Sequence, residues 1–241
     1  MVRGGRKDRK INADDIAEHG SVFDSSTGNV NSVAKKLGVT HTAVRRAMRE
    51  SVQGFADKAF EQLAGRKAAV ENNPLSMLQA VFGPGPRGGA VNARAAAKAL
   101  GVAPGTVRRW AAGTQKPSAD HLKGLKNAVN RVTQTKRGRR NVTQGYRSTR
   151  KGRQAAQQGG TVWVTGYQGP SVVDRDGTPT AYGSNRWRTV RMTVSPADID
   201  KLLQAYENGL EDLKEALTEI YDRTVAEWEF LTIDDFGIEP Q

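Results

Sequence analysis

Residues 33–47 read VAKKLGVTHTAVRRA, and residues 96–110 read AAKALGVAPGTVRRW. Eight of the fifteen positions are identical at an offset of 63 residues. The matched pairs are Ala34/Ala97, Lys35/Lys98, Leu37/Leu100, Gly38/Gly101, Val39/Val102, Val44/Val107, Arg45/Arg108 and Arg46/Arg109. Two copies at this spacing are too few and too far apart for a solenoid, so the repeat indicates two related units.

Each copy has the pattern of two short helices joined by a tight turn. Gly38 and Gly101 stand where the chain must take a left-handed conformation, which glycine adopts at little cost. Thr40 can cap the second helix of the first copy, and Pro104 suits the first turn of that helix in the second copy. Apolar residues three apart then form its buried stripe: Val44 and Ala47 in one copy, Val107 and Trp110 in the other. The pattern predicts two helix-turn-helix units.

The second helix of each copy is expected to expose residues that contact DNA. They are Thr42, Ala43, Arg45, Arg46 and Arg49 in the first copy, and Gly105, Thr106, Arg108 and Arg109 in the second. Arginine reaches guanine edges and phosphates. The alternative is an ordinary corner between two helices. Two copies with Arg-Arg at the same place, in a chain of net charge +12, favour DNA binding.

The composition narrows the class of protein. The chain has 241 residues and no cysteine, which excludes disulfides and zinc fingers within it and fits a reducing compartment. No apolar run approaches the roughly 20 residues of a membrane helix, and the basic N-terminus lacks the apolar core of a signal peptide. We therefore expect a cytoplasmic, nucleoid-associated protein with no membrane partner, and no cofactor is predicted.

Charge is distributed unevenly along the chain. Residues 191–241 carry 4 basic and 13 acidic side chains, so the remainder has a net charge of +21. No acidic residue occurs between Asp120 and Asp174. The middle of that stretch has few apolar residues and is interpreted as a basic linker that is mobile alone and contacts phosphates when DNA is present. The basic residues of this linker that are predicted to contact DNA are Lys136, Arg137, Arg139, Arg140, Arg147, Arg150 and Lys151. Lys116, which precedes the stretch, is predicted to contact DNA as well.

The expected fold is mainly α with a C-terminal α+β module. The predicted order is a basic arm (1–11), a first helix-turn-helix domain (12–72), a second one (73–133), a basic linker (134–160) and an acidic module (161–241). Within the module, β-rich residues 161–165 and alternating residues 187–194 flank a turn-like stretch over 169–186. Two helices to about Glu207 and over 210–224 and an alternating strand over 225–233 follow, giving strand, helix, helix, strand.

From about residue 75 to the end, the chain resembles the terminal proteins attached to the telomeres of actinobacterial linear chromosomes and plasmids. The resemblance rests on the order AVNARAAAKALGVAPGTVRRW, a Lys116-Pro117 element, a basic stretch, RMTVSP, a helical pair with EALTEIYDR, and EWEFLTIDDF. The first helix-turn-helix unit and its arm look like an addition to the usual shorter form.

This resemblance implies a protein primer, which offers a side-chain hydroxyl to the first deoxynucleotide and stays attached to the 5′ end. It implies telomeric DNA or its single-stranded overhang, a DNA polymerase and a telomere-associated protein as partners. The polymerase supplies the catalysis, so the chain is not expected to be an enzyme. Alignment without gaps places the acceptor at Ser184. Because the family residue is usually Thr, Thr180 is an alternative, and Thr178 and Tyr182 lie in the same segment.

Two other classes compete with this interpretation. A repressor, plasmid initiator or partition protein would also carry two helix-turn-helix units, with the α+β module as a dimerisation element. An enzyme is less favoured, because the three histidines, His19, His41 and His121, are scattered. Asp174, Asp176, Asp234 and Asp235 could bind Mg²⁺, but paired carboxylates in turns and tails are usually only solvated.

Overall fold

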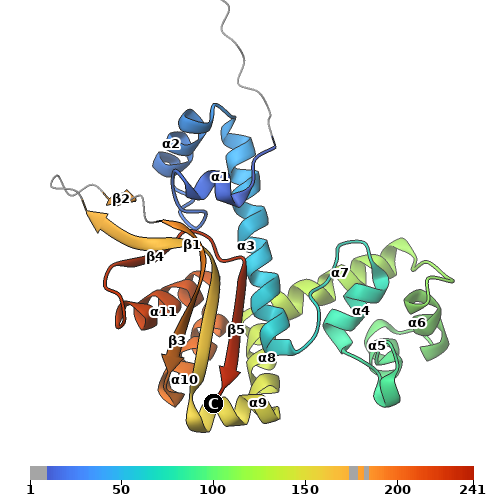
Figure 1. Cartoon of the computed structure of the whole chain (residues 1–241). Helices are drawn as coiled ribbons and strands as arrows, with labels where there is room; N and C mark the ends of the chain where they lie inside the picture. The colour runs from blue at the N-terminus through green and yellow to red at the C-terminus, as the bar shows by residue number, and fades with distance from the viewer. Residues whose placement is uncertain (1–9, 174–178, 182–184) are drawn as a thin grey trace, which may run out of the picture. The chain divides into compact units, whose positions relative to one another are not determined.

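The computed structural model describes residues 10–173, 179–181 and 185–241 of the chain. The fold is mainly α with an α+β module in the C-terminal part (Figure 1). The chain forms two compact units. The sheet unit comprises the residues up to Ala56 together with Lys151–Gln241, and the helical unit comprises Asp57–Arg150. Each unit is described separately below.

The sheet unit begins with three helices, α1 (Ala13–Ala17), α2 (Thr27–Leu37) and the first part of α3 (His41–Ala64). Gly38 ends α2 in the left-handed conformation, with φ 68° and ψ 25°. The Val39 amide donates to the Ala34 carbonyl at 3.1 Å, and the Ala43 amide donates to the Thr40 hydroxyl at 3.2 Å. The turn and the cap are therefore as predicted.

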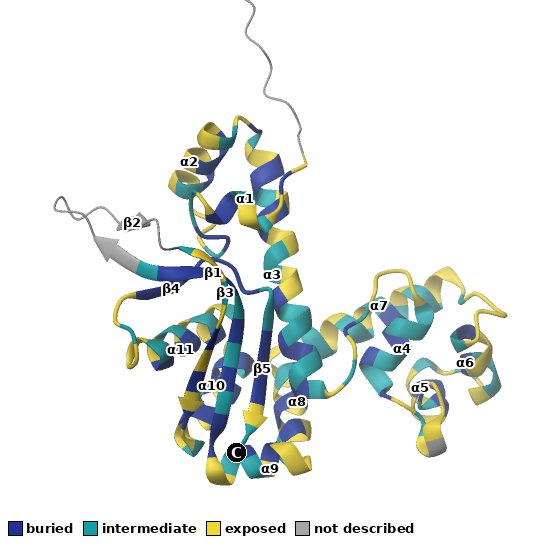
Figure 2. Cartoon of the chain, in the orientation of Figure 1, coloured by how far each residue is buried: buried dark blue, intermediate teal, exposed yellow. Residues whose placement is uncertain are grey.

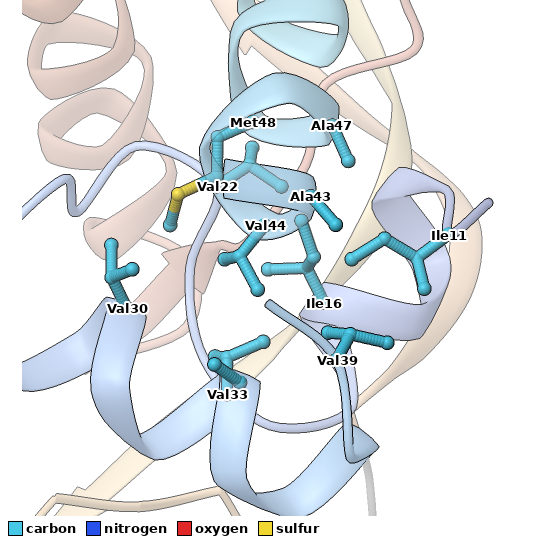
Figure 3. Close-up of a cluster of buried hydrophobic side chains, with 11 residues drawn as sticks. Ile11, Ile16, Val22, Val30, Val33, Val39, Ala43, Val44, Ala47 and Met48 are labelled. Atoms are coloured by element: carbon cyan, nitrogen blue, oxygen red, sulfur yellow. The ribbon is translucent and has the colours of Figure 1, made fainter. Parts of the chain in front are cut away.

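A small apolar core holds these three helices together (Figure 3). Val30 and Val33 of α2 meet Val44 and Met48 of α3, with Ile16 of α1 beside them, and all five are at most 4% exposed. Burying a side chain of this size contributes about 1.5–3 kcal/mol. Helices α1 and α2 have only 5 and 11 residues, too few to be stable in isolation, so their packing against α3 fixes them.

The sheet is built around one long strand, β1 (Gly160–Val173). Antiparallel to it lie β3 (Arg186–Val194), in register from Gly160↔Val194 to Gln168↔Arg186, and β5 (Asp235–Pro240). The short strands β4 (Trp228–Phe230) and β2 (Pro179–Ala181) pair with β1 farther along. Every other strand therefore depends on β1 for its main-chain hydrogen bonds.

Two helices cover one face of this sheet, α10 (Pro196–Asn208) and α11 (Leu210–Asp222). Val162 and Val164 of β1 and Val190, Met192 and Val194 of β3 are buried, and the pairing of the two strands places them on one face of the sheet. The alternation over residues 187–194 predicted this for the three β3 residues. Figure 2 shows buried stretches on β1, β3 and β5.

The start of α10 is held by Asp198, which forms a capping box with Ser195. Burial alone would raise the pKa of Asp198, but hydrogen bonds from the Ser195 hydroxyl and amide and the Arg223 guanidinium keep this pKa below its usual value.

The helical unit holds the rest of α3, α4 (Pro74–Phe82), the 3₁₀ turn η1 (Pro86–Gly88), α5 (Ala93–Leu100), α6 (Pro104–Ala111), α7 (Ala119–Thr133) and α8 (Lys136–Ser148). Leu78, Val107, Trp110 and Leu125 form its core. Gly101 ends α5 with φ 68° and ψ 31°, and the Val102 amide donates to the Ala97 carbonyl at 3.1 Å. The α5–α6 turn therefore repeats the α2–α3 turn.

The prediction of a mobile linker over residues 134–160 is wrong. Residues 136–158 form α8 and α9 (Arg150–Gln158). Val142, Thr143 and Tyr146 are buried in α8, and this narrow stripe is enough to fix the helix although most of its residues are polar or basic. Burial also raises the pKa of the Tyr146 hydroxyl. The apolar residues of this stretch are sparse, but Val142 and Tyr146 stand four residues apart and so lie on one face of a helix.

The domain boundaries also differ from the prediction. Helix α3 runs without a break from His41 to Ala64, and the first helix pair belongs to the sheet unit, where the Val22 amide donates to the Leu231 carbonyl at 3.1 Å. The second pair belongs to a unit larger than the predicted 73–133, because α8 packs on α7.

The predicted order strand, helix, helix, strand was incomplete. Part of the supposed turn over 169–186 is strand, because β1 extends to Val173 and pairs with β2. The strand predicted over 225–233 is only Trp228–Phe230, and β5 was missed because Asp235, Gly237 and Pro240 are poor strand formers. Among the described residues, no helix is long and apolar enough to cross a membrane.

Two glycines of α8 provide a matched test of the α7–α8 packing. A Cβ at Gly138 would overlap the Arg131 carbonyl oxygen of α7, whereas a Cβ at Gly145 would meet no atom within 4 Å. Gly138→Ala should therefore destabilise the helical unit by about 1–3 kcal/mol. Gly145→Ala should stabilise it by about 0.5–1 kcal/mol through helix propensity. Urea unfolding followed by circular dichroism measures both, and equal effects of the two substitutions would contradict the packing described.

Candidate nucleic-acid interface

The exposed face of α3 begins at its first turn. His41, Thr42, Arg46 and Arg49 are exposed, as expected for residues available to a ligand. Arg45 differs, because it is half-buried and its Nη1 donates to the Ser25 carbonyl at 3.3 Å. Of the two neighbouring arginines, Arg46 is therefore the one that is free to reach outward.

The prediction that Ala43 is exposed is wrong. Ala43 is 1% exposed and points into the cluster that contains Ile16 and Val44 (Figure 3). The short helix α1 gives α3 a second packing neighbour, so the buried stripe of α3 is wider than the repeated residues suggest.

The corresponding helix of the second pair, α6, exposes Arg108 and Arg109. Arg109 is held in place, because its Nε donates to the Gln115 Oε1 at 2.8 Å and its Nη2 donates to the Thr106 Oγ1 at 3.2 Å. Thr106 and Gly105 are half-buried rather than exposed, and Lys116, in the following loop, is exposed. The preordered guanidinium of Arg109 loses less conformational entropy on binding than a free side chain would.

The residues predicted as linker contacts lie on two helices. Lys136, Arg137, Arg140, Arg150 and Lys151 are exposed, and Arg139 and Arg147 are half-buried. The Arg139 Nη1 donates to the Gln134 carbonyl at 2.9 Å. Helix α8 thus has a buried apolar stripe and a basic outer surface, which is a fixed arrangement rather than a mobile tail.

Positive charge is concentrated in the helical unit. Asp57–Arg150 contains 18 Lys and Arg against four Asp and Glu, a net charge of +14, so the rest of the chain has a net charge of −2. An excess of this size over fewer than a hundred residues gives a positive potential that attracts polyanions. The unit with the second helix pair therefore carries essentially all of the positive charge excess.

The predicted priming hydroxyls are only partly placed. Ser184, Thr178 and Tyr182 lie outside the described residues. Thr180 lies in β2, with its backbone in register with Val172 of β1. In the sequence all four lie between Val173, where β1 ends, and Arg186, where β3 begins.

The sheet unit also exposes an aromatic side chain that the sequence analysis did not single out. Trp187 of β3 is 57% exposed, and its Nε1 donates to the Asp234 carboxylate at 2.9 Å. Burial raises the pKa of Asp234, and this hydrogen bond partly opposes the shift. The signal in the sequence was a tryptophan on the polar side of an alternating strand.

Comparison with models of known protein families, with curated proteins and with solved structures finds no match for this chain.

Proposed function

We propose that the chain binds duplex DNA through two helix-turn-helix units, formed by α2–α3 and α5–α6. The observation that carries the proposal is that the same left-handed glycine turn occurs in both pairs. In each pair the amide of the residue after the glycine donates to an alanine carbonyl of the first helix at 3.1 Å. A second helix with Arg-Arg at the same place then follows.

The chemistry of the exposed residues supports this role. The major groove admits an α-helix, and arginine can form two hydrogen bonds with the O6 and N7 atoms of guanine. Arg46 and Arg109 occupy equivalent positions in the two pairs and are both exposed. The first turn of α3 and the helix α6 would therefore be the recognition helices, with α2 and α5 supporting them.

The charge of the helical unit supplies the part of the affinity that does not depend on sequence. Lys and Arg that displace counterions from phosphates contribute to affinity on any duplex. In this proposal the basic outer surface of α8 contacts the DNA backbone, and its fixed helical form means that little ordering is needed on binding.

Equivalent substitutions in the two pairs test the recognition role. Arg46→Ala and Arg109→Ala should each weaken binding to a selected duplex by about 1–3 kcal/mol if the side chain contacts a base, and should relax sequence preference there. Lys35→Ala and Lys98→Ala remove the same charge from exposed, equivalent positions of the supporting helices and serve as controls. Fluorescence anisotropy of the full chain on selected and scrambled duplexes measures the effects. Losses that match the lysine controls on both duplexes would refute base recognition by these arginines.

We further propose, as a second candidate, that the DNA-bound chain is the primer of a linear replicon, as its resemblance to telomere terminal proteins implies. A supporting observation is that, in the sequence, the candidate hydroxyls lie between Gln168 and Arg186, the last residues through which β1 and β3 pair. Such a connection can extend into the active site of a polymerase. A polymerase and a telomere-associated protein would then be its partners. A DNA-binding regulator, by contrast, would form no covalent bond to DNA through this hydroxyl.

Mass spectrometry of protein recovered from replicon ends after nuclease digestion tests the primer role. The expected result is one nucleotide on a peptide that covers residues 176–188, attached to Ser184, Thr180, Thr178 or Tyr182. Thr165→Ala, elsewhere on β1, is a control that should leave the linkage intact. If the peptide is unmodified and detergent frees the protein from DNA, the function is that of a regulator.

A further inference from the structure

The glycine-rich loop GPGPRGG, residues 83–89, takes no part in the two helix pairs described above. The loop is folded onto itself, because the Gly85 amide donates to the Gly89 carbonyl at 2.7 Å and the Asn92 amide donates to the Gly83 carbonyl at 3.0 Å. A Cβ at Gly85 would lie 2.6 Å from the Val91 carbonyl oxygen, so this position requires glycine. The loop is therefore a fixed structure at the start of α5.

A cavity of about 480 Å³ lies against this loop in the helical unit. Its walls are Gly85, Pro86 and Gly89 of the loop, the segment 91–93, and the side chains of Arg94 and Arg108. Among the residues that the structure describes, no acidic side chain lines it. Arg94 extends from the first turn of α5 and Arg108 from the exposed side of α6.

The two guanidinium groups have no counterion. Both side chains are exposed, and within the described part of the chain neither has a hydrogen-bond or ion-pair partner. Two positive charges that line one cavity without a carboxylate repel each other. An anion bound between them offsets this unfavourable electrostatic energy. Guanidinium is planar and presents several N–H donors, which matches a phosphate group.

The loop lets a ligand approach closely. Gly89 lines the cavity without a side chain, and a Cβ there would be in ordinary van der Waals contact with the Gly85 Cα and the Pro86 carbonyl oxygen, both at 3.5 Å. The cavity has room for a phosphate together with the groups attached to it. None of the described residues in its walls carries an aromatic ring on which a base could stack.

We propose that loop 83–89, Arg94 and Arg108 form a phosphate-binding pocket in which the two guanidinium groups hold one phosphate. The pocket itself does not rest on the proposed DNA binding. Only the source of the phosphate does, because a DNA phosphodiester is available only if the chain binds DNA. In a DNA complex, the ligand is a phosphodiester beside the groove that α6 enters. Arg108 then positions the protein on the backbone, and of the Arg-Arg pair only Arg109 contacts bases.

The test compares Arg94→Gln and Arg108→Gln with Lys98→Gln, an exposed residue of α5 that does not line the cavity. The full chain is used, and melting temperatures establish that each variant is folded. One arm measures binding of inorganic pyrophosphate by isothermal titration calorimetry. The other arm measures the salt dependence of affinity for a duplex and for its scrambled counterpart.

Loss of a charge-assisted contact should weaken pyrophosphate binding about tenfold or more in the two pocket variants and leave Lys98→Gln unchanged. If the phosphate is part of DNA, both pocket variants should also lower the log–log salt slope by about one unit and weaken both duplexes equally. If only pyrophosphate binding is lost, the pocket takes a free phosphate compound.

The proposal is overturned if the pocket variants match Lys98→Gln in both arms, or if the wild-type chain binds neither pyrophosphate nor duplex. It is also overturned for Arg108 if Arg108→Gln affects the selected duplex alone, because Arg108 would then contact a base. Pyrophosphate binding that depends on both arginines in a chain that does not bind duplex would sustain the pocket and refute the proposed DNA binding.

Discussion

The left-handed turn at Gly38 and Gly101 is the constraint on which both helix pairs depend. At φ 68° in each case, the glycine reverses the chain so that the next amide can donate to the alanine carbonyl of the preceding helix. A side chain at such a φ costs on the order of 1 kcal/mol. The turn fixes which residues of the second helix face the core, and Val44 and Val107 are both fully buried. The exposed arginines follow from the same geometry.

The two pairs are stabilised by different surroundings. In the first pair, α1 closes the core, and the Val22 amide connects it to the β-sheet part of the same unit by donating to the Leu231 carbonyl. In the second pair, α4 and α7 take that role through Leu78 and Leu125. The repeated residues therefore specify the turn and the central contacts, whereas the outer contacts are specific to each copy. This difference is the reason that Ala43 is buried although the repeat alone indicated an exposed position.

The sequence allowed the helix pairs, α10, α11 and the buried face of β3 to be predicted, because glycine turns, caps and apolar spacing are local signals. It did not reveal α8, whose buried stripe of Val142, Thr143 and Tyr146 is interrupted by many basic residues. It also did not reveal β5, because Phe236 and Ile238 become strand residues only by pairing with β1, more than 60 residues earlier. The candidate site shows the same difference between local and long-range signals. Its exposed arginines were predictable from the local pattern, whereas the cavity beside loop 83–89 depends on contacts between residues that are apart in the sequence.

The central claim is that the exposed side of α3 and α6 contacts base edges in the major groove. The most direct measurement is the affinity of the full chain for its selected duplex with guanine replaced by 7-deazaguanine, which removes one major-groove acceptor and leaves the backbone and minor groove unchanged. The account predicts a loss of about 1–3 kcal/mol at each contacted guanine and no loss on scrambled duplexes. Equal affinity for the natural and substituted duplexes, at every guanine of the site, would contradict it.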